Sequence, residues 1–229
     1  MPHARKAGFM ALAFMALTLF AGATTAFADP ITITTGNPGN QDTDNVLFND
    51  GSLQHTGTLV QGNFNGAGAG FIVDFTSSSG NGQLVGDGGQ ATVLGGTGNT
   101  PFTQLTFGLE GGATFTKAIF NLDVTNDAGD GNATITVNYF DTVTNQTFSQ
   151  VFAVQANGQN FFAVEASMNA VITSIEISTS DTSFINAAQF RLGGFAQATP
   201  EPTTMLLLGT GLASIAAGVR RRRKAAKTD

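Results

Sequence analysis

Apolar and polar side chains alternate with a period of two along most of the chain, in short runs separated by glycine, asparagine and aspartate. The clearest runs lie at 71–75, 105–109, 120–124, 135–139, 148–154, 174–178 and 189–192, and weaker ones at 31–35, 52–61, 91–94 and 161–166. Alternation places one face of a strand in a core and the other in water, as in antiparallel sheets. We therefore predict about ten short antiparallel strands.

The runs follow one another with no amphipathic helical segment between them, which favours a two-sheet antiparallel sandwich of jelly-roll type over residues 29–195. Residues 62–98 contain 12 glycines and are predicted to form loops around strands at 71–75 and 91–94. A phosphate-binding glycine loop needs a strand-to-helix context and usually a lysine, and this stretch has neither.

The N-terminus predicts a signal helix. Arg5 and Lys6 precede an apolar run at 9–23, and Ala26 and Ala28 form a small-x-small cleavage pattern. Residues 1–28 are therefore interpreted as a signal peptide, with an uncleaved N-terminal anchor as the alternative.

The C-terminus predicts a transmembrane helix. Residues 196–202 form a proline-containing linker, and the apolar, uncharged segment at 203–219 has 17 residues. This length is at the lower limit for crossing a bilayer, about 17 residues. The basic residues in 220–229 are expected to stay in the cytoplasm, which leaves the body of the protein outside.

A motif, an apolar helix and an arginine cluster follow one another in this tail. They consist of Pro200, Glu201 and Pro202, then residues 203–219, then Arg220, Arg221, Arg222 and Arg223. This order closely resembles the PEP-CTERM sorting signal of Gram-negative bacteria. The resemblance implies that the chain uses the export machinery, enters the membrane transiently and is processed near the motif by an exosortase. It further implies a destination at the cell surface or in an exopolysaccharide-rich biofilm matrix, with a plain tail anchor as the alternative.

The charge of the body differs from that of the whole chain. Between residues 29 and 199 there are 14 acidic residues and only two basic ones, Lys117 and Arg191, so the net charge is 2 − 14 = −12. Such a surface repels nucleic acid and anionic lipid and is compatible with divalent cations and with neutral or cationic partners. Because the chain has no cysteine, thiol catalysis and disulfides are excluded.

Two oxygen-rich stretches are candidate Ca²⁺ sites, because hard cations prefer carboxylate and amide oxygens. The candidate ligands are Asp127, Asp130 and Asn132 in one turn and Asp42 and Asp44 near the N-terminus. Aspartate, asparagine and glycine also gather in turns for conformational reasons alone, which is the alternative interpretation.

No set of residues predicts catalysis. His55 is the one histidine of the body and is interpreted as a surface residue, while Glu110, Glu165 and Glu176 are its only glutamates. Nothing in the sequence selects a pair of carboxylates facing one cleft. We expect no catalytic residues and no enzymatic activity, with an unrecognised hydrolase as the least favoured alternative.

Sugar stacking is also poorly supported, because the chain has no tryptophan and its one tyrosine, Tyr139, falls on a predicted core position. The expected function is that of an exported structural or adhesive protein associated with exopolysaccharide. The alternative is a carbohydrate-binding module that uses hydrogen bonds, with Ca²⁺ as a supporting cofactor.

Overall fold

The computed structural model describes residues 29–39, 42–79, 82–96, 98, 100–125, 129–141, 144–156 and 158–197. These residues form β-strands and one short 3-10 helix, Glu110–Gly112. Within the described ranges, no helix has the length and apolar character needed to cross a membrane. The predicted signal helix at 1–28 and the predicted transmembrane helix at 203–219 lie outside these ranges.

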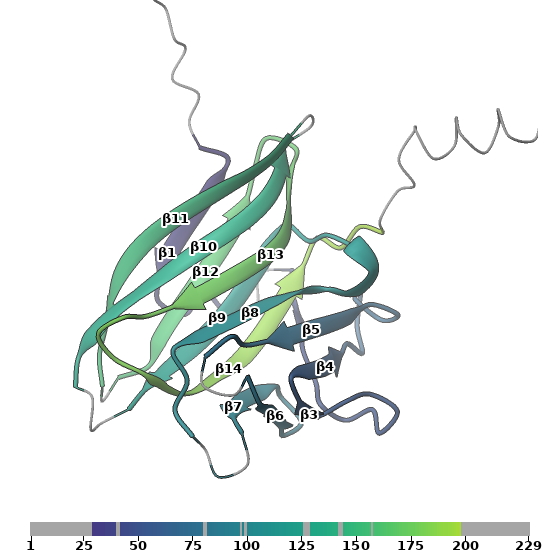
Figure 1. Cartoon of the computed structure of the whole chain (residues 1–229). Helices are drawn as coiled ribbons and strands as arrows, with labels where there is room; N and C mark the ends of the chain where they lie inside the picture. Colours follow the sequence, from purple (N-terminus) through teal and green to yellow (C-terminus); the bar gives the residue numbers. More distant parts are fainter. Residues whose placement is uncertain are drawn as a thin grey trace, which may run out of the picture. The chain divides into compact units, whose positions relative to one another are not determined.

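The strands form two antiparallel sheets, which confirms the predicted all-β architecture (Figure 1). The eight-stranded sheet contains, in spatial order, β1 (Ile31–Thr35), β12 (Asn160–Ala166), β9 (Lys117–Val124), β14 (Phe184–Gly193), β7 (Thr92–Gly95), β6 (Leu84–Asp87) and β3 (Thr56–Gly57), with β2 (Asp44–Asn45) paired to β14. The six-stranded sheet contains β11 (Thr144–Val154), β10 (Gly131–Asp141), β13 (Ala170–Ser178), β8 (Gln104–Leu109), β5 (Ile72–Thr76) and β4 (Leu59–Asn63).

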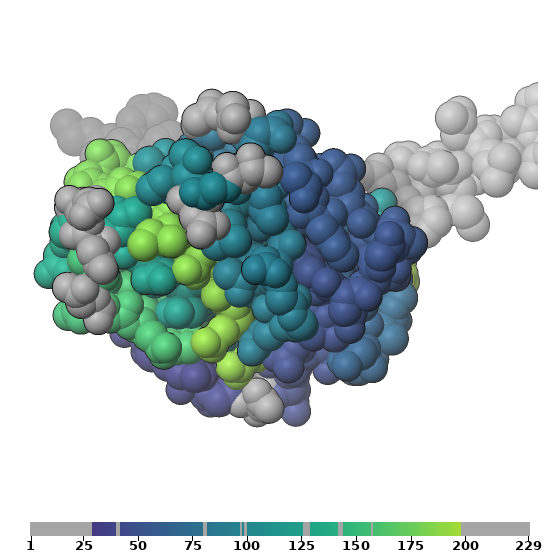
Figure 2. Space-filling model, turned by 90° about the horizontal axis from the view of Figure 1, so that it is seen from below, coloured from purple at the N-terminus to yellow at the C-terminus, as the bar shows by residue number. Residues whose placement is uncertain are grey.

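Neighbours within a sheet come from distant parts of the chain. The last strand, β14, lies in the middle of its sheet between β9 and β7, and β1 pairs with β12. Figure 2 shows the same mixing on one face, where late residues in yellow-green lie among teal ones. Each half of the chain is therefore needed to complete the other.

The core between the sheets is filled mainly by phenylalanine. Phe75 on β5 and Phe107 on β8 contact Phe190 on β14 with ring centroids 4.8 Å and 5.1 Å apart. Phe107 also contacts Phe120 on β9 at 5.6 Å. All four rings are almost completely buried. Edge-to-face aromatic pairs of this kind are worth about 0.5–1.5 kcal/mol each beyond the area they bury, so packing can hold the sheets together without disulfides.

The prediction for the glycine-rich part was wrong in detail. Residues 62–98 contain the additional strand β6, which pairs with β7 and β3. The single strand expected at 52–61 is divided into β3 and β4, because Gly57 adopts a φ of 139° that interrupts the run. The two-residue strand β2 was also not predicted, since Asp44 and Asn45 are typical of turns.

Residues 64–71, within the glycine-rich part, form a turn that packs against Phe195, and we call it the packed turn. The ring of Phe195 lies 5.0 Å from that of Phe64 and 5.1 Å from that of Phe71, measured between centroids. A Cβ at Gly68 would lie 2.7 Å from Cζ of Phe195, so this position has no room for a side chain. The turn thereby fixes the last described residues of the body.

Candidate ligand site on the outer face of the eight-stranded sheet

Ala26 and Ala28, the motif Pro200, Glu201 and Pro202, and the cluster Arg220, Arg221, Arg222 and Arg223 all lie outside the described residues.

The first predicted calcium stretch has structural hydrogen bonds. Asp127 lies outside the described residues, whereas Asp130 Oδ1 accepts a hydrogen bond from the backbone N–H of Ala156 at 2.8 Å. Asn132 donates from its backbone N–H to Asp181 Oδ1 at 3.0 Å and from its side-chain amide to Oδ2 at 2.8 Å. These two bonds hold the pKa of Asp181 below its ordinary value of 3.8. Asp181 was not selected from the sequence, because its partner is 49 residues away.

The second predicted calcium stretch stabilises the packed turn. Asp44 Oδ2 accepts a hydrogen bond from the backbone N–H of Gly68 at 2.6 Å, and Asp42 is exposed with a left-handed φ of 50°. Among the described residues, no group of three or more His, Asp or Glu side chains is placed to hold a metal ion. Calcium binding stays a prediction, which calorimetric titration of the protein with Ca²⁺ would test.

Two aromatic side chains were also assigned from the sequence. Tyr139 is buried with 6% exposure, as predicted. His55 is half-buried rather than on the surface, and its ring packs edge-on against Phe48 with centroids 5.6 Å apart. Its Nε2 is buried and has no hydrogen-bond partner within the described part of the chain.

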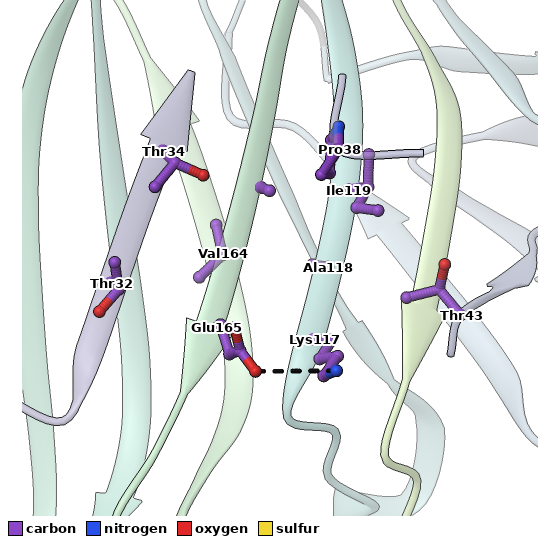
Figure 3. Close-up of a pocket in the computed structure, with 10 residues that line it drawn as sticks. Thr32, Thr34, Pro38, Thr43, Lys117, Ala118, Ile119, Val164 and Glu165 are labelled. Carbon is purple, nitrogen blue, oxygen red and sulfur yellow. Dashed lines mark ion pairs between the residues drawn. The ribbon is translucent and has the colours of Figure 1, made fainter. Parts of the chain in front are cut away.

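The outer face of the eight-stranded sheet carries a polar row across three strands. Thr32 on β1 lies opposite Glu165 on β12, and Glu165 lies opposite Lys117 on β9. Lys117 Nζ and a Glu165 carboxylate oxygen are 3.7 Å apart, and Figure 3 shows the two side chains pointing toward each other. The lysine side chain is 28% exposed and the glutamate side chain 58%.

The next row along the same strands is mostly apolar. Thr34 on β1 lies opposite Ala163 on β12, and Ala163 lies opposite Ile119 on β9. Ile119 in turn lies opposite Arg191 on β14. Ile119 is only 3% exposed although it faces outward, on the opposite side of β9 from the core residue Phe120. The NH1 group of Arg191 donates a hydrogen bond to the carbonyl of Gly39, at 3.2 Å, and so ties the segment after β1 to this face.

These two rows form a pocket of about 100 Å³, which we call the outer-face pocket (Figure 3). Its floor and sides include Thr32, Thr34, Lys117, Ile119, Ala163 and Glu165, and Pro38 and Thr43 form its rim. The hydroxyl oxygen of Thr43 is buried and has no hydrogen-bond partner among the described residues. The sequence holds one signal for this place: the only two basic residues of the body, Lys117 and Arg191, occupy outward positions of adjacent strands here.

Comparisons with known proteins bear on the tail and on the sandwich separately. Residues 198–223 match the family model of the PEP-CTERM protein-sorting motif, which confirms the resemblance seen in the sequence. No curated protein matches the chain at a significant level.

Two solved structures show weak likeness to the sandwich. A structure described as a xylan-binding domain from CBM 22 has 14% identity and a TM-score of 0.33, covering 72% of this chain and 100% of that one. A second contains the CBM22-1 and GH10 modules of a Clostridium thermocellum endo-1,4-beta-D-xylanase, with xylohexaose. It has 16% identity and a TM-score of 0.26, covering 72% of this chain and 26% of that one.

Proposed function

We propose that this chain, which carries a PEP-CTERM protein-sorting motif, is exported and processed by an exosortase, and that its body is a structural or adhesive component of the cell surface or extracellular matrix. The observation that carries the proposal is the motif match at residues 198–223, directly after the last described residue of the sandwich, Gln197. The proposal includes a Gram-negative cell envelope or biofilm matrix as the destination and an association with exopolysaccharide.

The composition of the body supports such a role. An all-β domain with a large phenylalanine core and no cysteine can remain folded outside the cell without redox control. The strand order favours the jelly-roll type, since β1 lies beside β12 and β14 beside β9. A net charge of −12 between residues 29 and 199 keeps such a domain soluble.

The proposal is tested by changing the motif and following the protein through the cell. Replacement of Pro200, Glu201 and Pro202 by alanine should leave the chain unprocessed and in the membrane fraction. The unchanged protein should be shortened near the motif and recovered from the surface or matrix. Mass spectrometry of the recovered protein and immunoblots of cell fractions measure both.

The matched control is Lys227→Ala, which alters a tail residue outside the matched segment and should not affect processing. The proposed location would be overturned if the motif variant were processed and distributed like the unchanged protein.

Carbohydrate binding is the second candidate function, and it is favoured by the outer-face pocket. This pocket offers paired hydrogen-bond donors and acceptors above an apolar floor, without a large aromatic side chain. Such a site would let an exported protein bind a polysaccharide of the surface or matrix.

A further inference from the structure

We propose that the outer-face pocket binds a neutral sugar residue of a polysaccharide, through hydrogen bonds to its hydroxyl groups. The proposal deepens the proposed matrix function and rests on it for the source of the sugar. The binding site itself is formed by residues of β1, β12 and β9 together with Pro38 and Thr43.

The Lys117–Glu165 pair is suited to vicinal hydroxyl groups. At 3.7 Å the nitrogen and oxygen are farther apart than in a charge-assisted hydrogen bond, which spans about 2.7–2.9 Å. The ammonium keeps donors available and the carboxylate keeps acceptors available. A hydroxyl group both donates and accepts, so one sugar hydroxyl can bridge the two, with Thr32 beside Glu165 in the next strand.

The floor of the pocket is suited to the apolar side of a sugar ring. The buried side chain of Ile119 and the methyl group of Ala163 lie side by side across the β12–β9 pair, and Pro38 stands at the edge. C–H groups on one face of a pyranose can pack against such carbons by dispersion. Ala163 and Pro38 therefore offer the accessible apolar carbons of the pocket, since Ile119 is only 3% exposed.

Thr43 lines the pocket and has a hydroxyl group that is unsatisfied within the described residues. Its hydroxyl oxygen is buried at the rim and has no hydrogen-bond partner among the described residues. A buried polar atom left without a partner is costly, and such atoms are rare in folded proteins. Because this oxygen has almost no accessible surface, a sugar hydroxyl would become its partner only after the side chain turned toward the pocket.

Charge and size decide the class of sugar. Among the lining residues the charges of Lys117 and Glu165 cancel, and the Arg191 guanidinium on the next strand donates to the Gly39 carbonyl. The strongly acidic body repels an anionic polymer such as a polyuronate. The volume of about 100 Å³ is that of roughly three liquid water molecules. The pocket thus holds part of one ring from the side and leaves the rest of the polysaccharide outside.

Isothermal titration of the full-length chain, in a detergent without sugar groups, tests the proposal. The ligands are cellohexaose, xylohexaose and mannohexaose as neutral glycans and oligogalacturonate as the anionic one. At least one neutral glycan should bind, and Ala163→Leu, which fills the floor, should abolish the binding heat. Glu165→Gln should weaken the same binding about tenfold, since a hydrogen bond to a charged group is lost.

Glu176→Gln is the matched control, because it makes the same change on the outer face of the six-stranded sheet. It should bind as the unchanged protein does, and equal melting temperatures would show that the variants are folded. The proposal is overturned by binding that survives Ala163→Leu and Glu165→Gln, by binding of oligogalacturonate alone, or by no binding of any neutral glycan. Because this measurement uses purified protein, its outcome is independent of whether the tail directs the chain to the matrix.

Discussion

The two sheets have outer faces built from the same alternating pattern, yet these faces differ in how their polar groups are satisfied. On the six-stranded sheet, Thr136 and Ser149 share a hydrogen bond of 2.9 Å, and the Asn138 amide donates to Ser174 at 3.0 Å and accepts from Thr147 at 3.0 Å. These side chains hydrogen-bond to one another across β11, β10 and β13. These residues satisfy part of their hydrogen-bonding capacity within the face itself.

The outer face of the eight-stranded sheet is different because part of it is covered. Ile119 and Asn121 face outward on β9 but are only 3% and 7% exposed. The buried oxygens of the Asn121 side chain and of Thr43 have no hydrogen-bond partner within the described ranges. A side chain that points away from the core is therefore not always exposed to solvent. A face with unsatisfied polar groups is the better candidate for ligand binding.

The largest expected effect comes from truncating the buried outward side chain. Ile119→Ala should lower the free energy of unfolding by about 2–5 kcal/mol, because a buried isoleucine loses its packing. The matched change on the other face, Thr136→Ala, removes one exposed hydroxyl and should cost less than about 1 kcal/mol. Urea unfolding of both variants measures the difference, and equal losses would show that the two faces are alike.

A smaller effect is expected from adding a methyl group to each face. A Cβ at Gly193 would be in direct contact with the backbone oxygen of Asp42, and one at Gly108 would lie 2.7 Å from the backbone oxygen of Thr173. Each change to alanine should cost about 1–3 kcal/mol through overpacking.

Only Gly193→Ala should also weaken glycan binding, because it displaces the segment that carries the rim residue Thr43. The unfolding free energies and the binding heats of both variants test this. If Gly108→Ala reduced binding as strongly, the effect could not be assigned to the pocket rim.

The smallest effect concerns acid stability beside the six-stranded sheet. The pKa of Asp181 is lowered in the folded protein by hydrogen bonds from Asn132 and Thr179. A lowered carboxyl pKa stabilises the folded state above the ordinary value of 3.8, and this contribution is lost as the pH falls through the folded-state pKa. Stability of the Asp181→Asn variant, measured by unfolding between about pH 5 and pH 2, should therefore fall less steeply than that of the unchanged protein. Equal slopes would contradict the assignment.

Alternation predicted which side chains form the core but not which strands are neighbours. Phe107 and Phe120 lie on predicted inward positions and are buried, as is Tyr139. The pairing of β1 with β12 joins residues more than 120 positions apart, and no local pattern contains that information. The outer-face pocket could not be predicted for this reason, since Thr32, Glu165 and Lys117 meet only through that pairing.

Two short strands that contain turn-forming residues were missed for a different physical reason. β2 and β6 have two and four residues, and their Asp44 and Asp87 are residues that favour turns. Their strand geometry comes from pairing with β14 and β7 rather than from local propensity. The predicted calcium ligands illustrate the same ambiguity, because Asp130 and Asp44 both accept backbone hydrogen bonds in the folded body.

The central place of β14 has a consequence for export. The eight-stranded sheet is complete only when β14, which ends at Gly193, has paired with both β9 and β7 in the middle of that sheet. A chain that crosses the membrane with its N-terminus first must therefore delay its folding until nearly the whole body has emerged. The sorting motif begins at residue 198, only a few residues later. A completely folded body therefore requires the chain up to the residues just before the sorting motif.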